Sequence, residues 1–233
     1  MKLVPASSPG MEAAHRHTNV RTTVDILMRD RNLLRPTARF LRKFTSRDQS
    51  DFEENLDALR LFLSRPDSNG VVTVPDYVIT LTQTLSKLYQ QSDMDKIKYQ
   101  RGAVVESLVR QLIHHRYDRP GELCLNNQRF VENYRQITVK EVDVAALSTT
   151  RLKVEGYECK VSPTSFEPYG RINLSNLADA ANDRKYRANV GFVAFESDSV
   201  MKIKLIKLEL PSAIKLYGLD SIESLQHLSL LEN

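Results

Sequence analysis

Two apolar segments carry charged side chains that could act together in one site. Residues 139–147 contain Asp143, and residues 152–161 contain Glu158 and Lys160. Both segments are typical of strands, and side chains alternate between the two faces of a strand. Glu158 and Lys160 are therefore expected on one face, and pairing of the two strands would bring Asp143 close to them. The sequence predicts carboxylates and one ammonium group within a few ångströms of each other.

Grouped carboxylates repel one another, so the cluster is costly unless a cation or the lysine offsets its charge. Carboxylate oxygens are ligands suited to Mg²⁺ or Mn²⁺. Glu141 is expected on the same face as Asp143 and is a further candidate for the cluster. The alternative interpretation is a solvated strand face, on which these acids and nearby lysines form surface pairs that contribute little to stability.

An Asp near the end of one strand, followed by Glu-x-Lys on the next, resembles the motif of the PD-(D/E)XK nuclease superfamily, whose fold is restriction-endonuclease-like. The two halves of the motif are Asp143 and Glu158-Cys159-Lys160. The family also tends to place a Glu on the helix before the sheet, and Glu106 lies in a strongly helical run that resembles this element. Val142 stands where the motif has its proline, a position that varies widely in the family. The resemblance covers roughly residues 97–210.

The resemblance implies a role for each residue of the motif. Asp143 would be the central ligand of a Mg²⁺ or Mn²⁺ ion, Glu158 the second ligand, and the backbone carbonyl of Cys159 a third oxygen. Glu106 would bind a second ion directly or through water. Lys160 would orient the attacking water, help to deprotonate it, and stabilise the charge on the phosphate.

The function expected from the resemblance is metal-dependent hydrolysis of phosphodiester bonds, with DNA as the substrate, in restriction, repair or phage defence. One alternative is a catalytically inactive module of the same fold that binds nucleic acid or a protein partner. A weaker one is a metal-dependent phosphohydrolase acting on nucleotides. A homodimer is expected only by analogy, because many enzymes that cut two strands act as dimers.

Composition is compatible with these expectations. The chain has 233 residues and a formal net charge of +4, with a sequence pI near 9.0, which permits nucleic-acid binding without requiring it. The two cysteines, Cys124 and Cys159, form no CxxC pattern, so we expect reduced thiols rather than a disulfide framework. No apolar run is long enough for a signal peptide or a membrane span, which predicts a cytoplasmic protein without a membrane partner.

The densest run of basic residues lies in the N-terminal half of the chain. Arg35, Arg39 and Arg42 have i, i+4, i+7 spacing, so they could line one face of a helix with Lys43 beside them. Guanidinium groups pair well with phosphate oxygens, which predicts contacts to nucleic acid; a solvated helix surface explains the run about equally well. The resemblance also implies a polar or basic residue facing the site from the helix after the third strand. The candidates are Asn176, Asp179, Asp183, Arg184 and Lys185, of which Arg184 and Lys185 are predicted to contact nucleic acid.

The hydrophobic pattern predicts a flexible leader over residues 1–19, a helical region over 20–94 and a nuclease core over 95–233. The core is expected to be α/β with a mixed sheet in the order helix, three strands, helix, strand, which is the αβββαβ order of the restriction-endonuclease-like fold. Residues 200–210 alternate between apolar residues and lysines, which predicts an edge strand. Leu61 and Phe62 are expected to widen the buried face of a helix that begins after Asp51.

Overall fold

A computed structural model describes residues 1–6, 9–66, 70, 72–90 and 93–228 of the chain. It divides into two compact units, one formed by residues 1–8 and 105–233 and the other by residues 9–104. Across the described residues, the helices are too short or too polar to cross a lipid bilayer.

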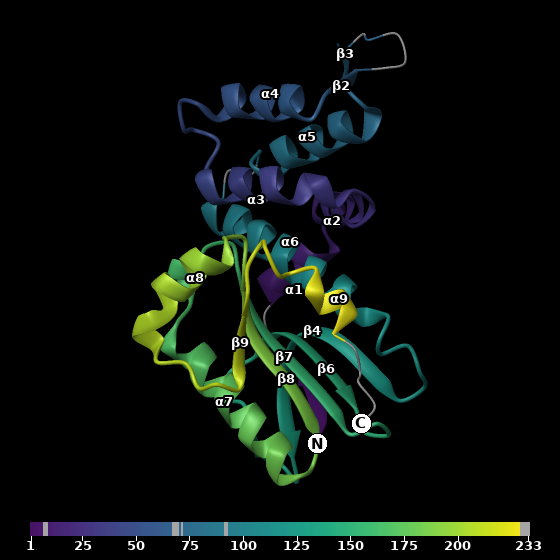
Figure 1. Cartoon of the computed structure of the whole chain (residues 1–233), viewed down its shortest axis with the longest axis vertical. Coiled ribbons are helices and arrows are strands. Elements are labelled where there is room, and N and C mark those ends of the chain that lie inside the picture. The colour runs from purple at the N-terminus through teal and green to yellow at the C-terminus, as the bar shows by residue number, and fades with distance from the viewer. Residues whose placement is uncertain (7–8, 67–69, 71, 91–92, 229–233) are drawn as a thin grey trace. The chain divides into compact units, whose positions relative to one another are not determined.

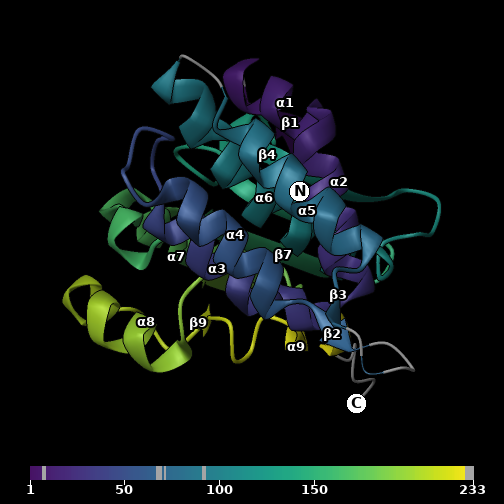
Figure 2. The same ribbon diagram turned by 90° about the horizontal axis from the view of Figure 1, so that it is seen from above.

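The unit of residues 9–104 is mainly helical (Figure 2). Its elements are α1 (Pro9–Arg16), α2 (Thr18–Arg29), η1 (Arg31–Leu33), α3 (Leu34–Lys43), α4 (Phe52–Phe62), the short hairpin β2 (Arg65–Pro66) and β3 (Val72–Thr73), α5 (Asp76–Leu88) and the first half of α6 (Met94–His114). This helical region was predicted from the 3.6-residue apolar period.

Aromatic rings join three helices of this unit. The ring centroid of Phe40 on α3 lies 5.3 Å from that of Phe52 on α4 and 5.9 Å from that of Tyr89 after α5. The Tyr89 hydroxyl donates to the backbone carbonyl of Phe44 at 3.0 Å. Arg101 on α6 donates from Nε to the carbonyl of Leu41 at 3.0 Å, which ties α6 to the end of α3.

The second unit is built on a mixed sheet (Figure 1). Its strands are β1 (Lys2–Pro5), β4 (Glu122–Glu132), β5 (Arg135–Gln136), β6 (Val142–Ser148), β7 (Lys153–Lys160), β8 (Arg187–Ala194) and β9 (Ile214–Tyr217). The strand order is β1-β4-β6-β7-β8-β9, with β5 paired to β4. The β4/β6 and β6/β7 pairs are antiparallel, whereas β7/β8 and β8/β9 are parallel. The remaining elements are η2 (Pro163–Ser165), α7 (Pro168–Asp183), α8 (Asp198–Leu205), η3 (Ile206–Leu208) and α9 (Ser224–His227).

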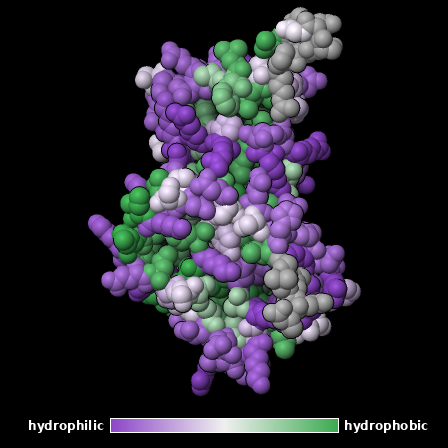
Figure 3. Space-filling model, in the orientation of Figure 1, coloured by the Kyte–Doolittle hydropathy of each residue, from purple (hydrophilic) through white to green (hydrophobic). Residues whose placement is uncertain are grey.

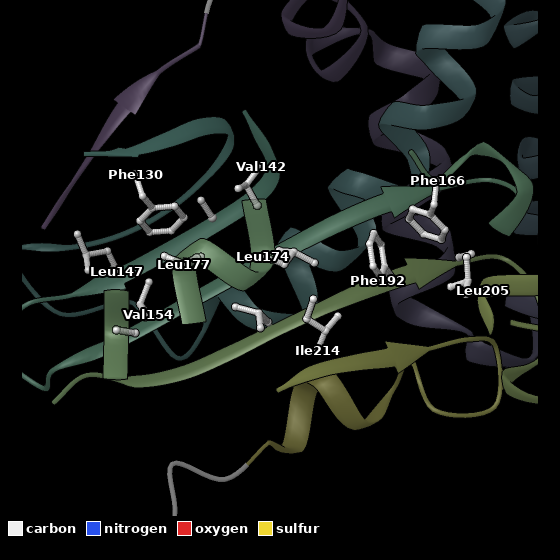
Figure 4. Close-up of a cluster of buried hydrophobic side chains, with 14 of the residues drawn as sticks. Phe130, Val142, Leu147, Val154, Phe166, Leu174, Leu177, Phe192, Leu205 and Ile214 are labelled. Carbon is white, nitrogen blue, oxygen red and sulfur yellow. The ribbon is translucent and has the colours of Figure 1, made fainter. Parts of the chain in front are cut away.

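Successive residues of β7 show which helix covers each face of the sheet. Glu155 accepts a hydrogen bond from Tyr117, just beyond the end of α6. A Cβ on the next residue, Gly156, would instead meet the side chain of Leu177 on α7 at 2.6 Å. Leu177 and Leu174 pack with Phe192 and other strand residues in one buried cluster (Figure 4). The absence of a side chain at Gly156 thus lets α7 lie close to the strand that carries the motif.

The predicted fold class is confirmed. The elements α6, β4, β6, β7, α7 and β8 follow one another in the expected αβββαβ order, and the sheet is mixed. Parallel β7 and β8 need a long crossover connection, which α7 supplies. The helix predicted over residues 95–115 is observed as α6, and the two strands of the motif as β6 and β7.

The prediction of a flexible leader over residues 1–19 is wrong for the described residues, because most of them lie in strands or helices; residues 7 and 8 lie outside the described part of the chain. Residues Lys2–Pro5 pair with β4, with Leu3 opposite Phe130, and residues 9–16 form α1. A four-residue edge strand is held mainly by backbone hydrogen bonds, so its sequence carries little hydrophobic pattern. The predicted boundary at residue 95 lies at the start of α6, whereas the two compact units divide inside that helix.

The prediction of an edge strand over residues 200–210 is also wrong. Residues 200–205 belong to α8, and residues 206–208 form η3. The Ser197 hydroxyl accepts a hydrogen bond from the N–H of Val200 and caps the helix start. Met201 and Leu205, four residues apart, are buried, while Ile203 is 71% exposed. Hydrophobic atoms accordingly lie at the surface over α8 (Figure 3).

A buried ion pair fastens β7 on the α6 side. Arg116 donates from Nη2 to Glu155 at 2.6 Å, and the hydroxyls of Tyr117 and Tyr157 donate to the same carboxylate at 2.9 and 2.6 Å. The side chains of Arg116 and Glu155 are 4% and 6% exposed. Removing one partner would leave an uncompensated charge in a medium of low polarity.

We therefore expect Arg116→Met to lower the free energy of unfolding by roughly 3–5 kcal/mol. Urea unfolding followed by circular dichroism measures the change. Arg119→Met, at an exposed neighbouring arginine, should alter it by no more than about 0.5 kcal/mol. An equal effect of both substitutions would show that the buried pair does not stabilise this unit.

Candidate active site

The site is built where the hydrogen-bond ladder between β6 and β7 ends. The last paired residues at that end are Val144 and Tyr157. One residue further, the Asp143 side chain takes the place of a strand partner, because its Oδ2 accepts from the backbone N–H of Cys159 at 2.7 Å. The same oxygen accepts from Nζ of Lys160, also at 2.7 Å. The structure thus joins both halves of the motif through one carboxylate oxygen.

Glu158 lies on the other side of the lysine. Its Oε2 is 3.8 Å from Nζ of Lys160, and its Oε1 is buried without a hydrogen-bond partner. Burial, followed by the negative charge of Asp143, raises the pKa of Glu158 to about 8; Lys160 and the amide of Asn173 oppose this rise. Near neutral pH this carboxyl group therefore holds a proton.

Lys160 is the cation that balances the cluster. Burial by itself disfavours the ammonium, but the carboxylates of Asp143 and Glu158 outweigh that effect and raise the pKa of Lys160. Its side chain is 30% exposed, compared with 11% for Asp143 and 9% for Glu158. The lysine is consequently charged throughout the physiological range and is the member most open to solvent.

Glu106 on α6 is buried and adds negative potential to the same site. Its charge contributes to raising the pKa of Glu158, of Lys160 and of the Cys159 thiol. The largest effect on the Cys159 thiol is burial, and the combined effects hold its pKa well above the usual value, so the sulfur stays protonated.

Asn173 on α7 is a site residue that the sequence analysis missed. This buried amide accepts from the backbone N–H groups of Val139 and Lys140 at 2.9 and 3.2 Å and donates to the carbonyl of Glu141 at 3.3 Å. It thereby holds the segment that leads into β6 and Asp143. The candidates proposed on α7 began three residues later, and one turn of helix decides which polar residue faces the sheet.

Gly170, in the first turn of α7, has a related positioning role. A Cβ there would lie 3.2 Å from Cγ of Glu158 and 3.1 Å from the ring of Phe192. The helix therefore approaches the Glu158 side chain without space for a methyl group, which limits where that carboxylate can move.

Glu141 does not join the cluster. It precedes β6, its side chain is 37% exposed, and its carboxylate lies 3.9 Å from Arg129. Arg184 forms an ion pair with Glu132, so its charge is already engaged, whereas Lys185 is exposed just after α7.

The predicted basic face of the helical unit is observed in altered form. Arg35, Arg39 and Lys43 are exposed and follow one another at four-residue intervals on α3. Arg42 is half-buried instead. Four residues advance a helix by slightly more than one turn, which keeps these three cations on one side.

Carboxylate and carbonyl oxygens are donors that a divalent cation takes, although no group of three or more His, Cys, Asp or Glu side chains within the described part of the chain is arranged as a metal site. The observation that supports the fit is the buried Glu158 Oε1, an acceptor without a donor. A cation there would balance a carboxyl group that burial otherwise keeps protonated. Asp143, Glu158 and the carbonyl of Cys159 would hold it, with Glu106 nearby.

Comparisons with known proteins leave the family open. No protein-family model matches the chain, and no match was found among curated proteins. Among solved structures, the chain is similar to Can2 from Sulfobacillus thermosulfidooxidans in complex with cyclic tetra-adenylate (cA4), at a TM-score of 0.38 and 12% sequence identity. The match covers 84% of this chain and 52% of that chain, about half of its length. Similarity at this level supports no inference about the present protein.

The raised pKa of Glu158 predicts a pH-dependent gain in stability for Glu158→Gln. Between its ordinary pKa and about 8, the folded state binds a proton that the unfolded state has lost, so wild-type stability falls as pH rises through this window. In EDTA, the variant should melt several degrees above wild type at pH 9 and at nearly the same temperature as wild type at pH 5. The corresponding difference in the free energy of unfolding at pH 9 is on the order of a few kcal/mol. Thermal denaturation at both pH values measures it.

Glu209→Gln, at an exposed carboxylate, is the matched control and should give the same small change at both pH values. A Glu158→Gln effect that does not change with pH would contradict a protonated Glu158 in the folded protein.

Proposed function

We propose that this protein is a metal-dependent nuclease that hydrolyses phosphodiester bonds in DNA. The observation that supports the proposal is the convergence of Asp143, Glu158 and Lys160 at the point where β6 and β7 separate. Asp143 lies on β6 and the other two residues on β7, and the three side chains supply the oxygen ligands and the cation that metal-dependent phosphodiester hydrolysis can use. Restriction, repair and phage defence are the settings implied by the family resemblance.

Each residue would have a distinct task in this reaction. Asp143, Glu158 and the carbonyl of Cys159 would hold Mg²⁺ or Mn²⁺, and Glu106 would contribute a further oxygen. When bound, the cation would supply neutralisation of the phosphate charge and a more acidic water. Lys160, already charged and the most exposed member, would orient the attacking water and stabilise the developing negative charge on the phosphate. Its ammonium would have to leave Asp143 to do so.

Contacts to nucleic acid would come from the basic residues outside this site. We assign this role to Arg35, Arg39, Arg42 and Lys43 on α3 and to Lys185 after α7. Arg184 and Lys43 are weaker candidates, because contact with a phosphate would compete with their ion pairs to Glu132 and Asp51.

The ion pair between Lys160 and Asp143 also favours a second function. A lysine bonded at 2.7 Å to the central carboxylate could be a permanent structural pair, in a module that binds nucleic acid without cutting it. Metal binding distinguishes the two functions, because a purely structural pair need not yield to a cation.

We expect Asp143→Ala and Lys160→Ala each to abolish Mg²⁺-dependent cleavage of DNA, with a loss of rate of about a hundredfold or more, because removing one electrostatic contact of this kind costs about that much. Circular dichroism should show both variants folded. Plasmid, single-stranded DNA, RNA and mononucleotides, digested side by side, would define the substrate and test hydrolysis of nucleotides.

Asp118→Ala and Lys202→Ala, at exposed positions of the same unit, are matched controls and should cleave like wild type. Calorimetric titration with Mn²⁺ should detect binding to wild type but not to Asp143→Ala. Cleavage that persists in both site variants would disprove the assignment. Absence of Mn²⁺ binding to wild type would favour the inactive module.

A further inference from the structure

A groove on the helical unit lies outside the site described above. It is lined by residues of α3 and α4 and has a volume of about 520 Å³. This is within the range of pockets that hold small ligands or a few nucleotides. The lining residues are Arg35, Pro36, Arg39, Phe40, Lys43, Asn55, Ala58, Leu59 and Phe62.

One wall of the groove is cationic. Arg35, Arg39 and Lys43 lie on α3 at intervals of four residues, about 6 Å apart along the helix axis. Lys43 bonds Asn55 across the groove at 3.0 Å and also pairs with Asp51. Within the described part of the lining there are three cations and no acid. The wall thus matches a ligand whose negative charges repeat at regular intervals.

The opposite wall is apolar and contains an exposed ring. Phe62 is 76% exposed at the end of α4, although the sequence pattern had placed it on the buried face. Ala58, one turn earlier, is small and also exposed, so space remains beside the ring. Figure 3 shows hydrophobic atoms at the surface over α4. An exposed aromatic face is the feature on which proteins stack the bases of single strands.

The two walls are held in place by the core of this unit. Phe40 forms part of the groove and packs edge-on against Phe52 of α4 at 5.3 Å. Leu59, which is 7% exposed, forms part of the lining from α4. The separation of the cationic and aromatic walls is therefore set before a ligand binds, which lowers the entropic cost of binding.

We propose that this groove binds a single strand of nucleic acid, with successive phosphates along Arg35, Arg39 and Lys43 and a base against the ring of Phe62. The inference rests on the proposed function, which makes nucleic acid the substrate, and it adds the strand type and the contacts. A duplex keeps its bases stacked inside and would offer none to Phe62. An acidic peptide would also match the charge, and the substitutions of Phe62 described below distinguish it from a single strand.

Binding of a fluorescently labelled oligothymidylate, followed by anisotropy in EDTA, tests the cationic wall. The double variant Arg35→Glu/Arg39→Glu should weaken binding by about tenfold or more. It should also make the slope of log K against log salt concentration less steep, by about 0.7 for each phosphate that the variant no longer neutralises. The matched control is Arg21→Glu/Lys87→Glu, which makes the same change in charge at exposed positions of the same unit outside the groove. An equal weakening in both double variants would overturn the proposal, because it would reflect net charge alone.

Substitution of Phe62 tests the aromatic wall and the kind of ligand. Phe62→Leu should weaken binding of the single strand by about tenfold, because stacking needs an aromatic ring. Phe62→Tyr keeps a ring and should bind the single strand as wild type does. A duplex of the same length should bind more weakly than the single strand and should not respond to either substitution. The proposal would be overturned if poly-glutamate displaced the oligonucleotide and Phe62→Leu bound the oligonucleotide as tightly as wild type. Those two results together would assign the groove to an acidic protein partner.

The measurement is independent of cleavage. Binding is followed in EDTA, which removes the cation that cleavage would need, so the groove can be tested even if the acidic site proves inactive. Suppose that the groove variants bind the oligonucleotide as wild type does, while Lys160→Ala has lost cleavage. This result would disprove the groove proposal and leave the nuclease proposal intact.

Discussion

The balance of charge around Lys160 is the interaction on which the rest of the site depends. Asp143 and Glu158 are both buried, and Glu106 adds a third negative potential from the neighbouring helix. Carboxylates in such surroundings cannot all be ionised without a compensating cation. One ammonium group contacts Asp143 directly and lies near Glu158, while the pKa of Glu158 rises until that group is protonated near neutral pH. The folded protein thus balances the buried charge of this cluster with the Lys160 ammonium and with a proton on Glu158.

The sheet and α7 keep this arrangement from relaxing. The β6/β7 ladder stops one residue before the site, and the Asp143 carboxylate satisfies the N–H of Cys159 that the missing strand partner would have taken. Asn173 holds the chain entering β6 by three backbone hydrogen bonds, and Gly170 lets α7 approach Glu158 closely. Regular secondary structure thereby supplies fixed positions for groups that would otherwise separate.

The helical unit follows a different principle. Its interior is held by aromatic rings around Phe40, whereas the ring of Phe62 is exposed in the groove that Arg35, Arg39 and Lys43 also line. An exposed ring next to guanidinium groups contributes little to folding, since it buries scarcely any surface. Functional and strained sites are where positions are expected to depart from what folding alone would favour.

The sequence by itself determined the order of the elements from α6 to β8 and the grouping of Asp143, Glu158 and Lys160. Apolar periodicity located α6, β6 and β7, and the residue types at Asp143, Glu158 and Lys160 indicated one cluster, because these patterns depend on local spacing along a strand or helix. Only the tertiary structure decided that Asn173 supports the site, that Glu141 lies outside it, and that residues 2–5 form an edge strand. It also decided that residues 198–205 form a helix despite their alternating pattern. These outcomes depend on which side chains distant in sequence come into contact, and that information is absent from any local pattern.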